Sequence, residues 1–151
     1  MGSQSRCQCQ RGVELLQGRV ARFDRKRWRG HLNIASTHAF TIIPHTFPYP
    51  VAKHALIGLT RSLALEYAGD GVRVNALAPG YVATRKVIDY WNSFDDPAAA
   101  RAKTLALHPG GRIATPEEIA MAALFLVSDE CPFINAACLV ADGGLSVLHH
   151  P

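Results

Sequence analysis

Two short apolar runs separated by one helical segment constrain the fold of this 151-residue chain more than any other feature. Residues 31–36 and residues 72–78 each have the length and apolar character of a buried strand. A helix is predicted between them, over residues 49–68. A strand, a helix and a second strand in this order form a parallel crossover, whose ligand sites lie at the carboxyl ends of the strands. The sequence therefore predicts an α/β fold with a parallel sheet.

Tyr49 and Lys53 lie four residues apart in the predicted helix, so their side chains share one face, one turn apart. An ammonium group near a phenol stabilises the phenolate and makes the phenol a usable acid and base near neutral pH. The same spacing also arises by chance on solvated helices. Ser36 ends the first predicted strand and Thr84 follows the second, so both fall at the edge of the sheet where ligands bind.

Four short motifs in this order resemble the short-chain dehydrogenase/reductase family. They comprise residues 33–36, residues 49–53, residues 75–84, and Asp142-Gly143-Gly144. The resemblance extends from about residue 31 to residue 148. It implies an α/β, Rossmann-like three-layer fold, of which this chain would hold the C-terminal half of the doubly wound parallel sheet.

The resemblance also implies roles for individual residues. Tyr49 would act as general acid/base, Lys53 would stabilise its phenolate and hold the nicotinamide ribose, and Ser36 would hydrogen-bond the substrate oxygen. The cofactor would be NAD or NADP, and the substrate an alcohol or carbonyl compound. The segment from Ser36 to Lys53 weakly resembles sugar dehydrogenases. The residues expected to contact the cofactor are Tyr49, Lys53, Pro79, Gly80, Val82 and Thr84.

The cofactor-binding half of such a fold is missing from the sequence. There is no glycine-rich turn between a first strand and helix, and no residue that would select NAD or NADP. Gly110-Gly111 follows no predicted strand and is given no phosphate role. Because hydride transfer needs the cofactor, we expect cofactor binding to be weak and this polypeptide alone to have little or no dehydrogenase activity. We also expect strand 31–36 to have an unpaired, aggregation-prone edge.

Residues 1–30 form an atypical basic segment with no counterpart in the family. They hold eight basic residues against Glu14 and Asp24, a net charge of +6, so the rest of the chain carries −2. If the codons of this segment are read one base later, suitable codon choices encode a sequence that resembles the family and includes Asp-Val-Asn. This favours a frameshift as the origin of the segment. If the segment is translated as written, its apolar spacing predicts an amphipathic helix over residues 11–27. Basic arms can bind nucleic acid or anionic membranes, but we expect neither.

The composition, 48% hydrophobic and 19% charged, is ordinary for a globular protein, and we expect a cytoplasmic location. The remaining elements are predicted as follows. Residues 37–48 are predicted to be a loop. His38, His45 and Phe47 are its candidate pocket residues, with surface positions for the histidines as the alternative. Residues 85–108 are predicted to form a helical flap, in which Tyr90, Trp91 and Phe94 line a pocket or simply pack. A helix over residues 116–128, buried by Ala120, Ala123, Leu124 and Leu126, precedes a last strand over residues 137–141.

Several expectations concern smaller features. The four cysteines are interpreted as reduced thiols, with Cys138 in the core. Residues 149–151 form a tail, and no metal site is expected. Relatives often have Thr-Gly where this chain has Asn135-Ala136, a departure expected to weaken the turn.

The helix over residues 49–68 supports an alternative function. It carries Leu56, Leu59, Leu63 and Tyr67 on one face and the smaller Ala55, Gly58 and Ser62 on another. Small residues allow a second helix to approach closely, and in relatives this helix contributes to a dimer interface. The chain could therefore be a homo-oligomer, or a non-catalytic interaction partner of an intact homologue.

Overall fold

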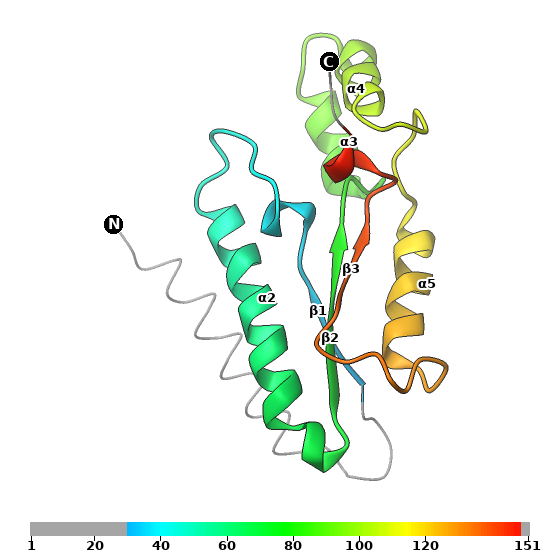
Figure 1. Ribbon diagram of the computed structural model, residues 1–151. Helices are drawn as coiled ribbons and strands as arrows, with labels where there is room; N and C mark the ends of the chain where they lie inside the picture. The colour runs from blue at the N-terminus through cyan, green and yellow to red at the C-terminus, as the bar shows by residue number, and fades with distance from the viewer. Residues whose placement is uncertain (1–29, 149–151) are drawn as a thin grey trace.

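The computed structural model describes residues 30–148, and in this part of the chain a parallel sheet lies between two helices. Its strands are β1 (Gly30–Ile34), β2 (Arg73–Pro79) and β3 (Cys138–Ala141), in the order β1-β2-β3. Helix α2 (Tyr49–Glu66) covers one face and α5 (Pro116–Val127) the other (Figure 1). The predicted three-layer α/β fold is confirmed. The predictions for residues 1–29, the basic helix and the shifted frame, and for the tail 149–151 lie outside the described residues.

The boundaries of the elements differ little from those predicted. Residues 37–48, predicted to be a loop, include a 3-10 turn, η1 (Thr37–Ala39). A second 3-10 turn, η2 (Ala68–Asp70), follows α2 and ends at Gly71, which has a φ of 75°. The flap region is helical, with α3 (Arg85–Asn92) and α4 (Pro97–Ala106), and a last turn η3 (Leu145–Val147) follows β3. None of the helices within residues 30–148 is long and apolar enough to cross a membrane.

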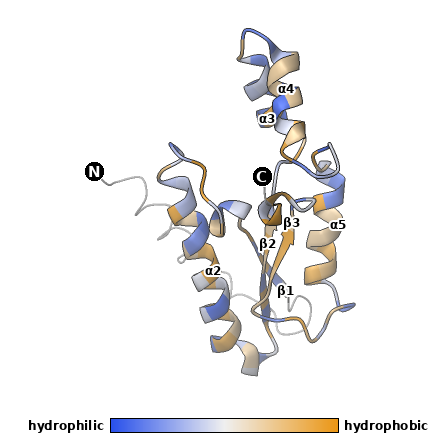
Figure 2. Cartoon of the chain, turned by 45° about the horizontal axis from the view of Figure 1, so that its top comes forward, coloured by the Kyte–Doolittle hydropathy of each residue, from blue (hydrophilic) through white to orange (hydrophobic). Residues whose placement is uncertain are grey.

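Strand β2 lies at the centre of the sheet and is the most buried element. Its interior residues, from Val74 to Ala78, are all buried, because β1 and β3 pair with its two edges and helices cover its two faces. In contrast, no strand in the described part of the chain pairs with the other edge of β1. Hydrophobic residues are concentrated in the strands and α5, while α2 alternates between hydrophobic and hydrophilic positions (Figure 2).

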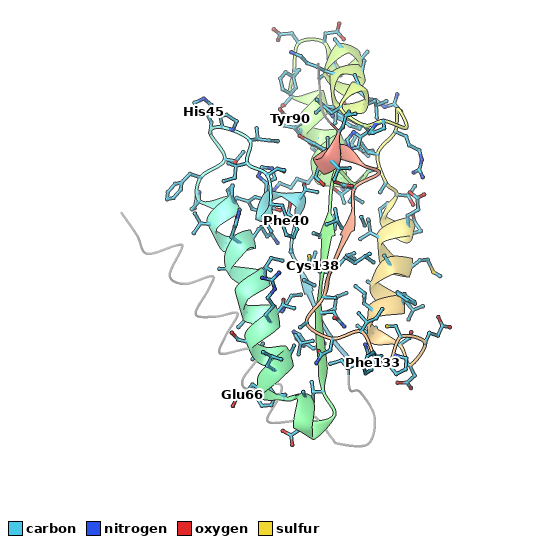
Figure 3. The ribbon with its side chains drawn as sticks, viewed as in Figure 1. Phe40, His45, Glu66, Tyr90, Phe133 and Cys138 are labelled. Carbon is cyan, nitrogen blue, oxygen red and sulfur yellow. The ribbon has the colours of Figure 1, made fainter. Side chains whose placement is uncertain are left out.

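Helix α2 packs on the sheet through Ile57, Thr60 and Ala64, not mainly through its leucine face. These three positions are buried, whereas Leu56, Leu59 and Leu63 are only partly buried. The small side chains of the sheet let the helix approach closely, and the buried Asn33 amide donates to the Thr60 hydroxyl at 2.9 Å. This contact ties α2 to β1 directly below the carboxyl end of the strand. Cys138, predicted to lie in the core, packs against the cluster of buried apolar residues between α2 and the sheet (Figure 3).

Helix α5 begins with a capping box and buries fewer residues than predicted. The Thr115 hydroxyl accepts from the Glu118 amide, and the Glu118 carboxylate accepts from the Thr115 amide at 2.8 Å. Hydrogen bonds from Arg112 and from the Thr115 backbone lower the pKa of Glu118 to about 2. Leu126 is buried, but the prediction that Ala120 and Leu124 are buried was wrong: both are exposed. Only three strands are available to this helix in the described residues, so its outward face has no cover there.

Side chains from β2 hold the segment between α5 and β3 in place. The Arg73 guanidinium donates to the carbonyl oxygens of Leu126, Ser128 and Ile134 at 2.7–3.1 Å. The buried Asn75 amide donates to the Ile134 carbonyl, and its oxygen accepts from the Ala137 amide. An Arg fork pre-organised in this way can satisfy several carbonyls at once. These contacts fix where β3 begins.

The turn before β3 places a non-glycine residue in the left-handed region. Ala136 has a φ of 58°, at a position where relatives often have glycine. A side chain at Cβ disfavours this conformation. Asn135 compensates, since its side-chain oxygen accepts from the Val74 amide at 2.8 Å and its amide donates to the Ala64 carbonyl. The turn is therefore held by side-chain hydrogen bonds in spite of backbone strain.

Ala136→Gly is expected to raise the free energy of unfolding by roughly 0.5–1 kcal/mol. Relief of the left-handed strain, about 1–2 kcal/mol, is partly offset by the greater freedom of glycine in the unfolded chain. Urea denaturation followed by circular dichroism measures the change. The matched control is Ala120→Gly in α5, which should lower stability by about 1 kcal/mol. A loss of similar size for both variants would show that Ala136 is not strained.

Candidate functional site

A cleft of about 450 Å³ lies at the carboxyl ends of β1 and β2 and contains two of the three predicted catalytic residues. Ser36 follows β1 by two residues, Tyr49 begins α2, and Gly80 follows β2. They meet because parallel strands end at the same edge of the sheet and the crossover helix returns to that edge. The other lining residues are Thr37, His38, Thr41, Ile43, Tyr81, Leu107, Leu145, Ser146 and Leu148.

Tyr49 and Lys53 lie one turn apart on the same face of α2. The Lys53 ammonium is 5.4 Å from the centroid of the Tyr49 ring. Its Nζ donates to the Ile34 carbonyl at 2.7 Å, and burial lowers the pKa of Lys53. The Ile34 carbonyl points away from β2, because the next amide, that of Ala35, donates to the Leu77 carbonyl. Lys53 thus joins α2 to the end of β1, and two of its three N–H donors stay available for a ligand.

Ser36 is buried at the base of the cleft and serves as the cap of η1. Its side-chain oxygen accepts a hydrogen bond from the His38 amide at 3.2 Å. A hydroxyl group that accepts one bond can still donate its own proton, and among the described residues no acceptor takes it. The hydroxyl of Ser36 is therefore placed to donate to an oxygen atom in the cleft.

The loop over residues 37–48 contributes to the cleft differently from what we predicted. His38 lines it, and the His38 ring meets the Tyr49 ring edge-on, with 5.4 Å between centroids. His45 and Phe47 do not line it: His45 lies at the outer end of the loop (Figure 3), and Phe47 is 83% exposed. The loop projects beyond the strand ends. Only its first part, from η1 to Ile43, faces the cleft.

The residues expected to contact a cofactor after β2 lie in a tight loop. Pro79 ends the strand, and the Gly80 amide donates to the Ala141 carbonyl at 3.1 Å. A Cβ at Gly80 would lie 2.8 Å from the Asp142 Cβ, so glycine is required there by the close approach of the turn after β3. Val82 forms a bridge with Ala114, and Thr84 caps α3 without a side-chain hydrogen bond, which leaves its hydroxyl free of any partner in the described chain.

The turn after β3 supports this loop from the other side. The Asp142 carboxylate accepts from the Gly144 amide at 2.9 Å and from the Ser146 amide at 2.8 Å. Burial opposes ionisation of Asp142, but these hydrogen bonds outweigh it and lower its pKa. Gly143 and Gly144 both have positive φ angles, which explains why this turn contains two glycines.

The sequence did not predict the apolar wall of the cleft. Leu107, Leu145 and Leu148 come from the end of the flap and from the turn after β3. Tyr81 could have been found, because it directly follows the Pro79-Gly80 turn at a strand end. Burial and the nearby Tyr90 raise the pKa of Tyr81. The leucines carry no such signal, since only the folded chain brings their segments to the cleft.

The flap aromatics take both roles left open by the sequence. Trp91 is buried and its indole N–H donates to the Thr104 hydroxyl at 3.0 Å, so it packs α3 on α4, and it also lines a separate pocket beside these helices. Tyr90 and Phe94 contact each other edge-on and line a neighbouring hollow. No group of three or more His, Cys, Asp or Glu side chains in residues 30–148 could hold a metal ion.

The described residues fit only one end of a nicotinamide dinucleotide. Lys53 and Tyr49 could hold a ribose, and the backbone from Pro79 to Thr84 could accept the nicotinamide beside them. When bound, such a cofactor supplies hydride chemistry, while the protein orients it and moves the proton. No glycine-rich phosphate loop follows a first strand in the described part of the chain.

Comparisons with known proteins agree with this arrangement. A family profile described as enoyl-(acyl carrier protein) reductase matches residues 13–146, a range that begins within the basic segment. The 2-(S)-hydroxypropyl-CoM dehydrogenase 3 of Xanthobacter autotrophicus is 38% identical over 78% of this chain and 46% of its own length. The 2,5-dichloro-2,5-cyclohexadiene-1,4-diol dehydrogenase of Sphingobium indicum is 39% identical over the same shares.

A solved structure gives the same result. The aldohexose dehydrogenase of Thermoplasma acidophilum is 37% identical, with a TM-score of 0.73 over 80% of this chain and 50% of that one. The chain therefore spans about half the length of the relatives it matches. Motifs, fold and similarity together show that this chain belongs to the short-chain dehydrogenase/reductase family.

Proposed function

We propose that this chain carries the acid/base and substrate-binding half of a site for NAD(P)-dependent oxidation of an alcohol or reduction of a carbonyl group. The observation that carries the proposal is the cleft shared by Ser36 and Tyr49, with Lys53 beside the tyrosine ring. A hydroxyl, a phenol and an ammonium gathered at the mouth of a parallel sheet suit proton transfer to and from a substrate oxygen.

In this proposal each side chain has one task. The Ser36 hydroxyl donates a hydrogen bond to the substrate oxygen and so orients it. Tyr49 transfers a proton to or from the same oxygen. The Lys53 ammonium, fixed by the Ile34 carbonyl at 2.7 Å and 5.4 Å from the centroid of the Tyr49 ring, binds a ribose hydroxyl with its other N–H groups. Tyr49 is 47% exposed, and a substrate seated against the apolar wall would displace water and strengthen these electrostatic interactions.

The proposal includes a requirement for a second half. The relatives are about twice as long as the matched region, and the described residues lack a phosphate-binding loop. We therefore propose that the chain by itself turns over little or no substrate, and that a cofactor-binding half restores activity. An alcohol or sugar is the proposed substrate class, in keeping with the diol and aldohexose dehydrogenases named above.

The first test joins the chain to the N-terminal half of an aligned relative. The chain alone should give no cofactor-dependent absorbance change at 340 nm, whereas the chimera should be active. Tyr49→Phe in the chimera should lower kcat by about 10²–10⁴, the usual contribution of a positioned acid/base group. Tyr90→Phe, which removes a hydroxyl from the flap, is the matched control and should keep the rate.

Two results would contradict the proposal. Turnover by the unmodified chain that depends on Tyr49 would show that no second half is required. A chimera that keeps its rate after Tyr49→Phe would remove the acid/base role.

A second candidate function is association through α2, as a homo-oligomer or as a partner of an intact relative. One observation favours it: Ala55, Gly58 and Ser62 form an exposed face of α2, and a Cβ at Gly58 would meet no described atom within 4 Å. Leu65 on the same helix is 76% exposed. Such a face allows a second helix to approach closely.

The Gly58→Leu substitution tests whether this face of α2 mediates association or is only exposed to solvent. In a monomer it should stabilise the helix by about 0.5–1 kcal/mol, since glycine is unfavourable in a helix interior. In an α2-mediated assembly, the added side chain should block contact and release monomers in sedimentation velocity, and should end co-purification with a full-length relative. Gly110→Leu, at another open glycine, is the control. An oligomer unaffected by Gly58→Leu would exclude this face.

A further inference from the structure

The cleft contains no charged side chain in the described chain. Its polar members are hydroxyl groups and one imidazole, and the rest of its wall is apolar. An ionised carboxylate or phosphate moved from water into such a site would lose solvation with no cation to replace it. Lys53, which lies beside the Tyr49 ring, is not among the lining residues and is held by the Ile34 carbonyl.

The neighbouring hollow does not supply the missing positive charge. It shares Tyr81 and Leu107 with the cleft and is lined by Asp95, Asp96 and Lys103. Two carboxylates outnumber one ammonium group, so the hollow carries no net positive charge. A substrate that extends from the cleft toward α4 therefore also meets no anion-binding site in the described residues.

His38 is the one side chain of the cleft with nitrogen atoms, and neither of them is engaged. No hydrogen bond joins its imidazole to another described residue, and its Nδ1 is buried without a partner. The ring is positioned only by its edge-on contact with Tyr49, at 5.4 Å. Burial lowers the pKa of His38, so its imidazole is neutral near pH 7 and offers one donor and one acceptor.

The buried Nδ1 is closed to a ligand, so the other ring nitrogen, Nε2, which is not among the buried atoms and has no partner in the described residues, is the one that can meet a ligand oxygen. The ring lies beside the phenol to which the reacting oxygen would bind, so a second oxygen of the same ligand would come within its reach. Ile43, Leu107 and Leu148 line the same cleft and present apolar surface of the kind that contacts a carbon ring. A cleft of about 450 Å³ is within the usual range for small-molecule sites.

We propose that His38 is a specificity-determining residue, which binds a second oxygen of an uncharged ring alcohol while Ser36 and Tyr49 hold the reacting oxygen. This inference rests on the proposed function of the same cleft. It selects neutral cyclic diols and hydroxyketones over ring alcohols with one oxygen, and selects both over hydroxy acids.

The test measures binding to the full chain and needs neither cofactor nor turnover. Dissociation constants are obtained by NMR titration for three probes: cyclohexane-1,4-diol, cyclohexanol and 4-hydroxycyclohexanecarboxylate. Methyl resonances of Ile43, Leu107 and Leu148 report whether a probe occupies the cleft. The diol should bind about three- to tenfold more tightly than cyclohexanol, the value of one neutral hydrogen bond, and the hydroxy acid at least about tenfold more weakly than the diol.

His38→Phe is the decisive variant, because it keeps a ring against Tyr49 and removes both nitrogens. The diol-to-cyclohexanol ratio should fall to about one, while cyclohexanol keeps its affinity within about twofold. His45→Asn, in the same loop but outside the cleft, should leave both constants unchanged; asparagine is chosen because His45 has a φ of 66°.

Three outcomes would overturn the inference: a ratio unchanged by His38→Phe, a hydroxy acid that binds as tightly as the diol, or no probe binding in the cleft. The two proposals fail separately. If the chimera keeps its rate after Tyr49→Phe but the His38 result holds, only the acid/base role is lost. If the activity of the chimera depends on Tyr49 but the diol-to-cyclohexanol ratio is unchanged by His38→Phe, only the recognition role is lost.

Discussion

The parallel pairing of β1 with β2 is the interaction on which the rest of the structure depends. It runs from Gly30 opposite Arg73 to Ile34 opposite Leu77, and the Ala35 amide extends it by donating to the Leu77 carbonyl. Because of this register, Ser36 and Gly80 come out at the same end of the sheet. A shift of one residue would turn the buried side of β1 outward and separate Ser36 from the tyrosine.

The second determinant is how closely α2 approaches that sheet. Alanines on the strands and Ile57, Thr60 and Ala64 on the helix leave little space between the layers. The Asn33–Thr60 hydrogen bond and the Lys53–Ile34 hydrogen bond then join the helix to β1 on both sides of the site. Tyr49 is thus positioned by contacts that lie along the helix, while its own ring remains accessible in the cleft.

The same packing explains what is exposed. Leu124 and Phe125 on α5, the free edge of β1 and Leu65 on α2 all lie on surfaces without cover in the described chain. A sheet of three strands is too narrow to cover all the apolar side chains of the two long helices. These surfaces give a physical reason for expecting either a second half of the fold or a partner. None of them is among the described lining of the cleft, which comes from residues 36–148.

The sequence by itself determined the order of elements, the parallel sheet, and the placement of Ser36 and Tyr49 at one edge, since each follows from local periodicity and from the geometry of a crossover. The family resemblance indicated a weakened turn at Asn135-Ala136, but the positive φ of Ala136 and the side-chain hydrogen bonds of Asn135 were visible only in the structure. Only the tertiary structure decided that His38 faces the cleft while His45 and Phe47 do not, that Arg73 holds three carbonyls, and that leucines from the flap and the last turn form the apolar wall. Those contacts join segments more than a hundred residues apart, and no local pattern records which of them meet in space.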